Sequence, residues 1–145
     1  MAATEQANKE LVRRFIEDAW SDGDLELVEE LVATDAEYHD PTLPDRPRGP
    51  DGSKRSIELY HTAFPDIQIR IEELIAEDDV VAARMTGTGT HEGEIMGIEP
   101  TGRRVEAPVM EFRRIEAGQI AEMWALVDTL GMLQQIGAIP EGFTE

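Results

Sequence analysis

Residues 105–128 read VEAPVMEFRRIEAGQIAEMWALVD, two strand-forming runs on either side of a short polar turn. The runs are Val105–Ile115 and Ile120–Asp128, and the turn between them contains Gly118. Glycine adopts the positive φ that tight hairpin turns require. The stretch therefore predicts an antiparallel hairpin of two long strands.

Alternating patterns predict further strands before this hairpin. Apolar and polar residues alternate over 67–71, which is typical of a half-buried strand. A second alternating run covers Val80–His91 and includes Met85. A short strand is expected at Glu37–His39. Together these segments predict a meander of mostly antiparallel strands.

Helical periodicity marks the N-terminal part of the chain. Residues 4–20 carry one wide apolar stripe, and a second helix is expected at about 25–34. The loop of residues 40–52 holds four prolines and leads into a third helix at about 51–64. A last short helix is expected at Thr129–Ile136. The order predicts an α+β fold, three N-terminal helices packed on a curved mixed, mostly antiparallel sheet, which forms a cone with a ligand pocket.

Length and composition narrow the classes of protein. A chain of 145 residues predicts one domain, residues 1–145. The absence of cysteine excludes disulfides, thiolate zinc sites and a cysteine nucleophile. No apolar run approaches the length of a transmembrane helix, and the polar N-terminus lacks a signal-peptide pattern. We therefore expect a cytoplasmic protein.

The net charge of −18 is the most pronounced feature of the composition. It argues against nucleic acid and anionic membranes as partners, because both would be repelled. Only two of the 13 basic residues, Lys9 and Lys54, are lysines. An acid-rich, lysine-poor surface favours adaptation to high salt, which screens self-repulsion. An ordinary acidic protein is the alternative.

Several motifs occur together in a characteristic order: WSDGD, YHDP, RGPDG, AFPD, TGTHEGEIMGIEPTGR and AGQIAEMWALVDTLGMLQQIG. In this combination the chain, over about residues 5–139, resembles SnoaL-like polyketide cyclases of the nuclear-transport-factor-2-like (NTF2-like) superfamily. The resemblance implies ring closure by intramolecular aldol condensation without a metal or organic cofactor. It implies that Asp128, in the W-x-x-x-D segment, is the acid/base. It also implies a homodimer formed through the open face of the sheet.

The last strand makes an independent case for Asp128. Glu122, Trp124, Leu126 and Asp128 share one face of a regular strand. If Trp124 and Leu126 line a pocket, Asp128 lies beside apolar walls, where a carboxylate gains basicity. Alternatively, Asp128 caps the helix that follows, since aspartate is a preferred N-cap residue.

The histidines are candidates to assist this aspartate. His39 is expected at the cavity mouth, or else as a loop histidine bonded to nearby backbone, and His91 is expected as a polar wall residue. His61 lies on a helix stripe and is more typical of a core or boundary position. No two histidines have the spacing of a metal site, so no metal ligands are predicted.

Aromatic and long side chains supply the expected substrate contacts: Tyr60, Phe64, Arg84, Met85 and Trp124. Arg84 could instead pair with a neighbouring carboxylate, and Glu122 with an arginine across the hairpin. The leading hypothesis is a cofactor-independent cyclase or isomerase that acts on a small hydrophobic carbonyl compound. A hydrolase using the same cavity, or a non-catalytic binding or dimerisation module, is the alternative.

Overall fold

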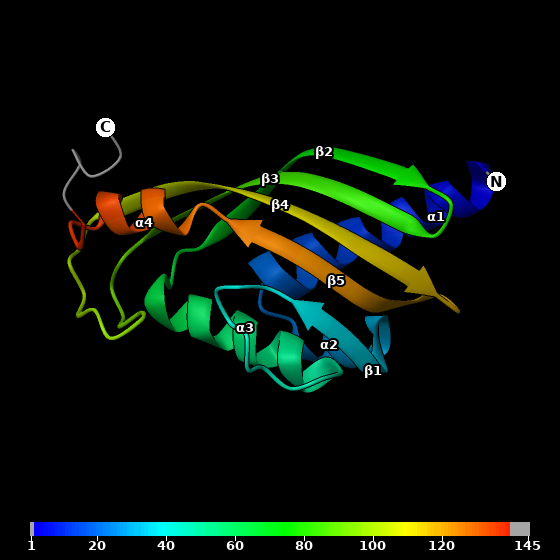
Figure 1. The fold of residues 1–145 in the computed structure, drawn as a ribbon, viewed down its shortest axis with the longest axis horizontal. Helices are drawn as coiled ribbons and strands as arrows, with labels where there is room; N and C mark the ends of the chain where they lie inside the picture. Colours follow the sequence, from blue (N-terminus) through cyan, green and yellow to red (C-terminus); the bar gives the residue numbers. More distant parts are fainter. Residues whose placement is uncertain (1, 140–145) are drawn as a thin grey trace.

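A computed structural model describes residues 2–139 of the chain (Figure 1). The polypeptide alternates helices and strands before it enters a long meander of strands. In chain order the elements are α1 (Ala2–Arg14), the π-helix η1 (Phe15–Ser21), α2 (Leu25–Leu31), β1 (Val32–His39), α3 (Pro50–Ala63), β2 (Gln68–Glu77), β3 (Val80–Thr90), β4 (Arg104–Glu116), β5 (Gln119–Val127) and α4 (Thr129–Gln135).

The strands form one five-stranded sheet in the order β1-β5-β4-β3-β2. The β1–β5 pair is parallel and the other three pairs are antiparallel. Helix α1 packs against β2 and β3, α3 against β1, and α4 against β4. Figure 1 shows α1 crossing behind the strands and α4 beyond the end of β5. The predicted α+β class and mixed, mostly antiparallel sheet are confirmed.

Two predicted boundaries near β1 are wrong. The second helix ends at Leu31 rather than near residue 34, and the strand predicted at Glu37–His39 begins at Val32. Val32 pairs with Ile120 of β5 and is fully buried, so sheet pairing overrides the helical pattern there. The helix begins at Leu25, as predicted. The Asp24 side chain caps it by accepting the Leu27 N–H at 3.3 Å.

The first predicted helix consists of two parts. After Arg14 the α-helix widens into η1, a seven-residue π-helix. In η1 the Asp22 N–H bonds the Glu17 carbonyl five residues back. Ile16, which is buried, and Trp20 both lie in η1 and line the cavity described below.

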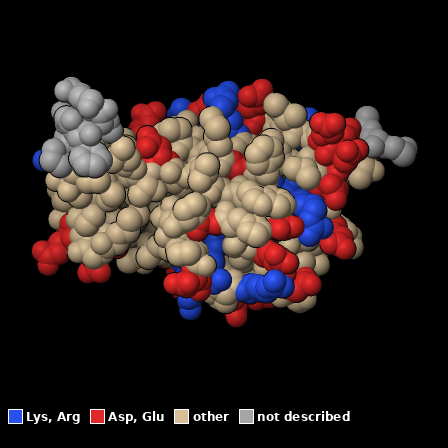
Figure 2. All heavy atoms as spheres, viewed as in Figure 1, with Lys and Arg blue, Asp and Glu red and all other residues tan. Residues whose placement is uncertain are grey.

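The two faces of the sheet differ in character. The inner face, toward the helices, carries the buried residues Val81, Ala83 and Met85 of β3. The outer face exposes large apolar side chains on three strands: Ile75, Met110, Phe112, Trp124 and Leu126. Figure 2 shows uncharged atoms over much of the middle of the molecule, with charged side chains both among them and at the margins. Among the described residues, no helix is both long and apolar enough to span a membrane.

Candidate active-site cavity

A cavity of about 110 Å³ lies between the helices and the inner face of the sheet. This exceeds the roughly 15 Å³ that a single water occupies by the same kind of measure. Small residues on neighbouring strands leave the space open, namely Gly87 and Gly89 on β3, Ala107 on β4 and Ala125 on β5. Most of the wall is apolar, and its ionisable members are Asp40, Tyr60, Glu111 and Arg113.

Glu111 and Arg113 form a buried ion pair on the inner face of β4. Arg113 Nε donates to Glu111 Oε1 at 2.5 Å, and Arg113 Nη2 donates to Oε2 at 3.1 Å. The two side chains are 6% and 4% exposed. The guanidinium carbon also lies 4.5 Å from the ring centre of Phe15. This two-point contact is the strong form of an arginine–carboxylate bond and holds Glu111 in one orientation.

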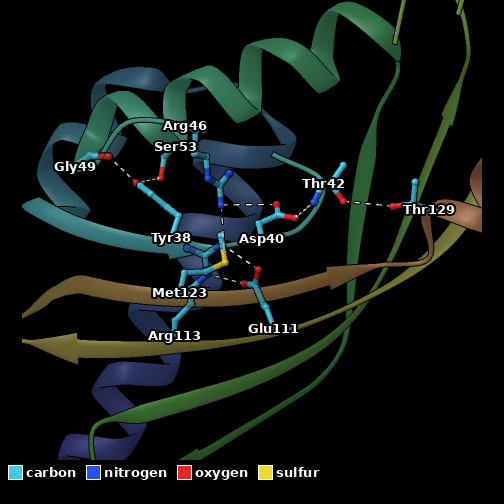
Figure 3. A network of polar contacts seen from close by, with 10 residues as sticks. All are labelled: Tyr38, Asp40, Thr42, Arg46, Gly49, Ser53, Glu111, Arg113, Met123 and Thr129. Carbon is cyan, nitrogen blue, oxygen red and sulfur yellow. Dashed lines mark hydrogen bonds and ion pairs between the residues drawn. The ribbon is translucent and has the colours of Figure 1, made fainter. Parts of the chain in front are cut away.

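A second acidic group, Asp40, enters the cavity from the loop after β1 (Figure 3). Its Oδ1 accepts the Thr42 N–H at 2.9 Å, and its Oδ2 lies 3.7 Å from Arg46 Nη2. The Asp40 and Arg46 side chains are 7% and 3% exposed. Burial, the largest effect, lowers the pKa of Arg46, and the charge of Asp40 opposes that shift. Asp40 is thus held more loosely by its arginine than Glu111 is.

Tyr38 holds the loop of residues 40–52 in place. The Tyr38 hydroxyl lies 2.6 Å from both the Gly49 carbonyl and the Ser53 hydroxyl, and its ring packs 4.2 Å from the Arg46 guanidinium. A β-carbon at Gly52 would lie 2.4 Å from the Tyr38 ring, so only glycine allows this approach. The RGPDG motif therefore positions the loop that carries Asp40 and Arg46.

Tyr60, on α3, adds a neutral donor to the cavity wall. Burial raises the pKa of its phenol to about 12, with a further contribution from the charge of Asp40. The hydroxyl therefore stays protonated at neutral pH. Within residues 2–139, neither the Tyr60 hydroxyl nor Arg113 Nη1 has a hydrogen-bond partner. A buried donor without a partner costs about 1–3 kcal/mol, so these atoms are suited to bind an oxygen in the cavity.

The structure places three of the predicted substrate contacts in the cavity wall and two outside it. Tyr60, Phe64 and Met85 line the cavity. Trp124 and Arg84 do not, because both belong to the outward-facing set of residues on their strands. Arg84 instead pairs with a carboxylate of β2, which was the alternative interpretation.

The pocket argument for Asp128 is also wrong in its geometry. It required Trp124 and Leu126 to line a pocket, but the side chains that do so are Ala125 and Val127. The Asp128 carboxylate is exposed and accepts the Gly131 N–H at 2.9 Å. Asp128 is therefore the N-cap of α4, as its alternative interpretation proposed.

The two candidate histidines lie apart from the cavity. His39 is exposed on the outer face, where its Nε2 lies 2.8 Å from Glu122 Oε2. His91 is fully buried, and its Nδ1 accepts the Thr101 N–H at 3.2 Å. Neither lines the cavity, so Asp128, His39 and His91 are not brought together. His61 bonds the Trp20 carbonyl at 2.6 Å, as expected of a boundary histidine.

Sequence reasoning missed the charged residues that line the cavity, namely Asp40, Glu111 and Arg113. The signal for Glu111 and Arg113 was available, because both share a strand face with Val105, Ala107 and Val109. Two opposite charges two positions apart on an apolar face predict a buried pair. Asp40 gave no such signal, since it lies in an irregular loop whose path depends on the rest of the fold.

The comparisons with known proteins agree with this architecture. A model of the SnoaL-like polyketide cyclases matches residues 10–136. The aklanonic acid methyl ester cyclase DnrD of Streptomyces peucetius is 30% identical over 144 residues, covering 92% of this chain and 95% of that protein. IdmH of Streptomyces antibioticus, a proposed polyketide cyclase, is 32% identical with a TM-score of 0.79, over 90% of this chain and 98% of its own.

AclR of Streptomyces galilaeus, a proposed hydroxylase, is 30% identical with a TM-score of 0.82, over 94% of this chain and 85% of its own. The NTF2-like fold thus accompanies more than one proposed activity, and it cannot by itself specify a reaction. The family match nevertheless extends from α1 to the end of α4 and includes every strand that lines the cavity. On this evidence the chain belongs to the family of SnoaL-like polyketide cyclases.

Proposed function

We propose that this protein is a cofactor-independent cyclase or isomerase that closes a ring in a small hydrophobic carbonyl compound by an aldol-type reaction. One observation carries the proposal: a largely apolar cavity holds a buried carboxylate beside two buried donors that lack partners among the described residues. Apolar walls fit the carbon skeleton of such a compound. The polar atoms fit the proton transfers that its reaction needs.

Asp40 is the best-supported acid/base in the cavity. Glu111 is engaged by Arg113 through both of its oxygens, so neither oxygen is open to a substrate. Asp40 has one oxygen bonded to the backbone and the other 3.7 Å from Arg46, so that oxygen is free to take a proton. Asp128, which the family resemblance implied, is exposed and occupied as a helix cap.

The proposed reaction conserves every atom of the substrate. Asp40 removes a proton from a carbon between two carbonyl groups, and the resulting enolate carbon attacks another carbonyl carbon. A carbon–carbon bond forms, and the new alkoxide takes the proton back from Asp40. The Tyr60 hydroxyl and Arg113 Nη1 donate to the oxygens on which negative charge develops.

The experiment compares Asp40→Asn with Asp128→Asn on aklanonic acid methyl ester, the compound named for the relative DnrD. Chromatographic separation of the substrate from its cyclised isomer measures turnover. Asp40→Asn should lower kcat by about 10²–10⁴, the usual range for a lost general base. Asp128→Asn should lower it less than about tenfold.

If Asp128→Asn lowers kcat far more than Asp40→Asn does, the base is Asp128 rather than Asp40. If the wild-type protein shows neither turnover nor solvent deuterium exchange with this compound or simple 1,3-diketones, the acid/base proposal fails. Tight binding of the same compounds without exchange would then favour a non-catalytic binding module. Formation of a product that has gained water would favour a hydrolase.

We also propose that the outer face of the sheet pairs with a second copy of this chain. Met110 pairs with Leu126, and Phe112 with Trp124, across β4 and β5, so their side chains form one contiguous apolar patch. These four residues are 38–65% exposed. Covering such a surface is favourable by about 25 cal/mol per Å² of apolar area.

A further inference from the structure

We propose that Glu37, His39 and Glu122 bind one divalent transition-metal ion, best Zn²⁺, on the outer face of the sheet. This inference does not rest on the proposed function, because none of the three residues lines the cavity. The carrying observation is the convergence of three ligand side chains from two strands. One donor atom from each lies within 4.8 Å of the other two.

The parallel pairing of β1 with β5 produces this arrangement. Glu37 lies directly opposite Glu122, and His39 lies two positions further along β1, so all three side chains leave the same face. His39 Nε2 already lies 2.8 Å from Glu122 Oε2. Donors on a tetrahedral zinc ion lie about 3.4 Å apart, given metal–ligand distances of about 2.1 Å. Small rotations of these side chains therefore bring all three donors around one ion.

The ligand types select the kind of metal. One imidazole and two carboxylates suit zinc and neighbouring transition metals, whereas calcium and magnesium prefer oxygen alone. The side chains of Glu37, His39 and Glu122 are 44%, 46% and 20% exposed. In the single chain an ion can therefore enter from solvent, and water can fill a fourth position. The net charge of −18 also concentrates cations near the surface.

Neighbouring groups hold the ligands in place. Arg114 Nε contacts Glu122 Oε1 at 3.3 Å, which leaves Oε2 for the metal. Arg48 lies 3.4 Å from Glu37, and Arg114 also pairs with Glu116 at 3.0 Å. The His39 ring stacks on Trp124 with 5.3 Å between ring centres and 16° between planes. Such outer contacts orient metal ligands and commonly affect affinity by about 10–100-fold.

Calorimetric titration of the metal-free protein with ZnCl₂ tests the site. The wild-type protein should bind one ion per chain with a dissociation constant below about 100 µM. His39→Ala and Glu122→Gln should each weaken binding by at least about tenfold. The matched control is Glu73→Gln, because Glu73 is also a sheet glutamate paired with an arginine. It should bind zinc like the wild type.

Weaker wild-type binding, unchanged binding by His39→Ala, or half an ion per chain would each overturn the proposal. A second measurement locates the ion through Trp124. Cu²⁺ at the site should quench tryptophan fluorescence in the wild type. Trp124→Phe keeps an aromatic ring for His39 to stack on, so it should lose that quenching while keeping its zinc affinity. Equal quenching in Trp124→Phe, which would then come from Trp20, would place the ion elsewhere and also overturn the proposal.

Discussion

The two faces of strand β4 carry neighbouring residues in opposite environments. On the inner face, Glu111 and Arg113 form an ion pair that is almost fully buried. On the outer face, the intervening Phe112 is 54% exposed, although it is among the most apolar residues of the strand. The usual arrangement of charge outside and apolar groups inside is locally reversed. Such a reversal is typical of surfaces that meet something other than water.

The difference fits the two contacts proposed for these faces. Buried charges are costly unless they are paired, and the pair beside the apolar cavity still leaves Arg113 Nη1 without a partner among the described residues, which suits the proposed ligand. Exposed aromatic and aliphatic groups leave apolar area in contact with water, and covering that area with a partner is favourable. The inner face is suited to a small molecule and the outer face to a protein surface.

The strongest test of the comparison removes one carboxylate from each face. Glu111→Ala leaves the Arg113 guanidinium buried and unpaired, which should lower the free energy of unfolding by about 3–5 kcal/mol. Glu73→Ala breaks the exposed Arg84 pair and should cost less than about 1 kcal/mol. Urea unfolding measures both values. Equal losses of unfolding free energy in the two variants would contradict the view that the inner pair is buried and the outer pair exposed.

A compensated variant sharpens that test. Replacing Glu111 by Leu and Arg113 by Met together removes both charges and leaves no unpaired group. This double variant should recover most of the stability that Glu111→Ala loses. If it is as unstable as the single variant, the loss comes from packing rather than from an unpaired charge.

The outer face is tested by introducing a charge. Leu126→Glu places a carboxylate in the apolar patch of both copies, and each leucine contributes about 1.5–3 kcal/mol when buried. Sedimentation should show a dimer in the wild type and a species near 16.2 kDa in the variant. Leu130→Glu, an exposed leucine on α4, is the control and should remain dimeric. A wild-type protein that sediments as a monomer would refute the dimer.

Alkaline pH should lower the free energy of unfolding through the buried phenol of Tyr60. Because the folded pKa of Tyr60 is about 12 rather than 10, its stabilising contribution is complete below pH 10 and is lost as the pH rises toward 12. The loss should reach about 2–3 kcal/mol. Tyr60→Phe should show a flatter stability profile over this interval. An unchanged profile would show that the phenol does not govern it.

Salt should act on the acidic exterior more than on the interior. Screening the repulsion of a −18 chain should raise the melting temperature by a few degrees between low salt and molar KCl, equivalent to about 1 kcal/mol. Thermal melts of the wild type and of Leu126→Glu separate screening from strengthened dimer contacts. A melting temperature that does not rise would refute the predicted adaptation to high salt.

The sequence predicted the fold better than the site, and β5 illustrates why. Its alternation correctly placed Trp124 and Leu126 on one face of the strand. Alternation says which residues share a face but not which face is buried, and here the larger side chains point outward. The prediction took Trp124 and Leu126 as the pocket wall, so it assigned the two faces of β5 the wrong way round. It thereby placed Asp128 and Trp124 on the wrong side.

The missed residues needed information beyond local pattern. Asp40 reaches the cavity only because the loop of residues 40–52 folds over Tyr38, and that path depends on contacts with Gly49 and Ser53. Glu111 and Arg113 were predictable in principle from their shared apolar face. Tyr60, Phe64 and Met85 line the cavity, as expected of aromatic and apolar residues on buried stripes, while their contact with a substrate stays a prediction.

The parallel β1–β5 pair has a consequence for how the chain acquires its structure. Its two strands bring together residues 83 positions apart, such as His39 and Glu122, whereas β2 to β5 lie next to one another in chain order. During synthesis, β1 leaves the ribosome long before its partner exists. The four-stranded meander can assemble as it emerges, but β1 docks only after residues 119–127 have been made. Strand β1 therefore reaches its final place after the meander has formed, although it is the first strand to be made.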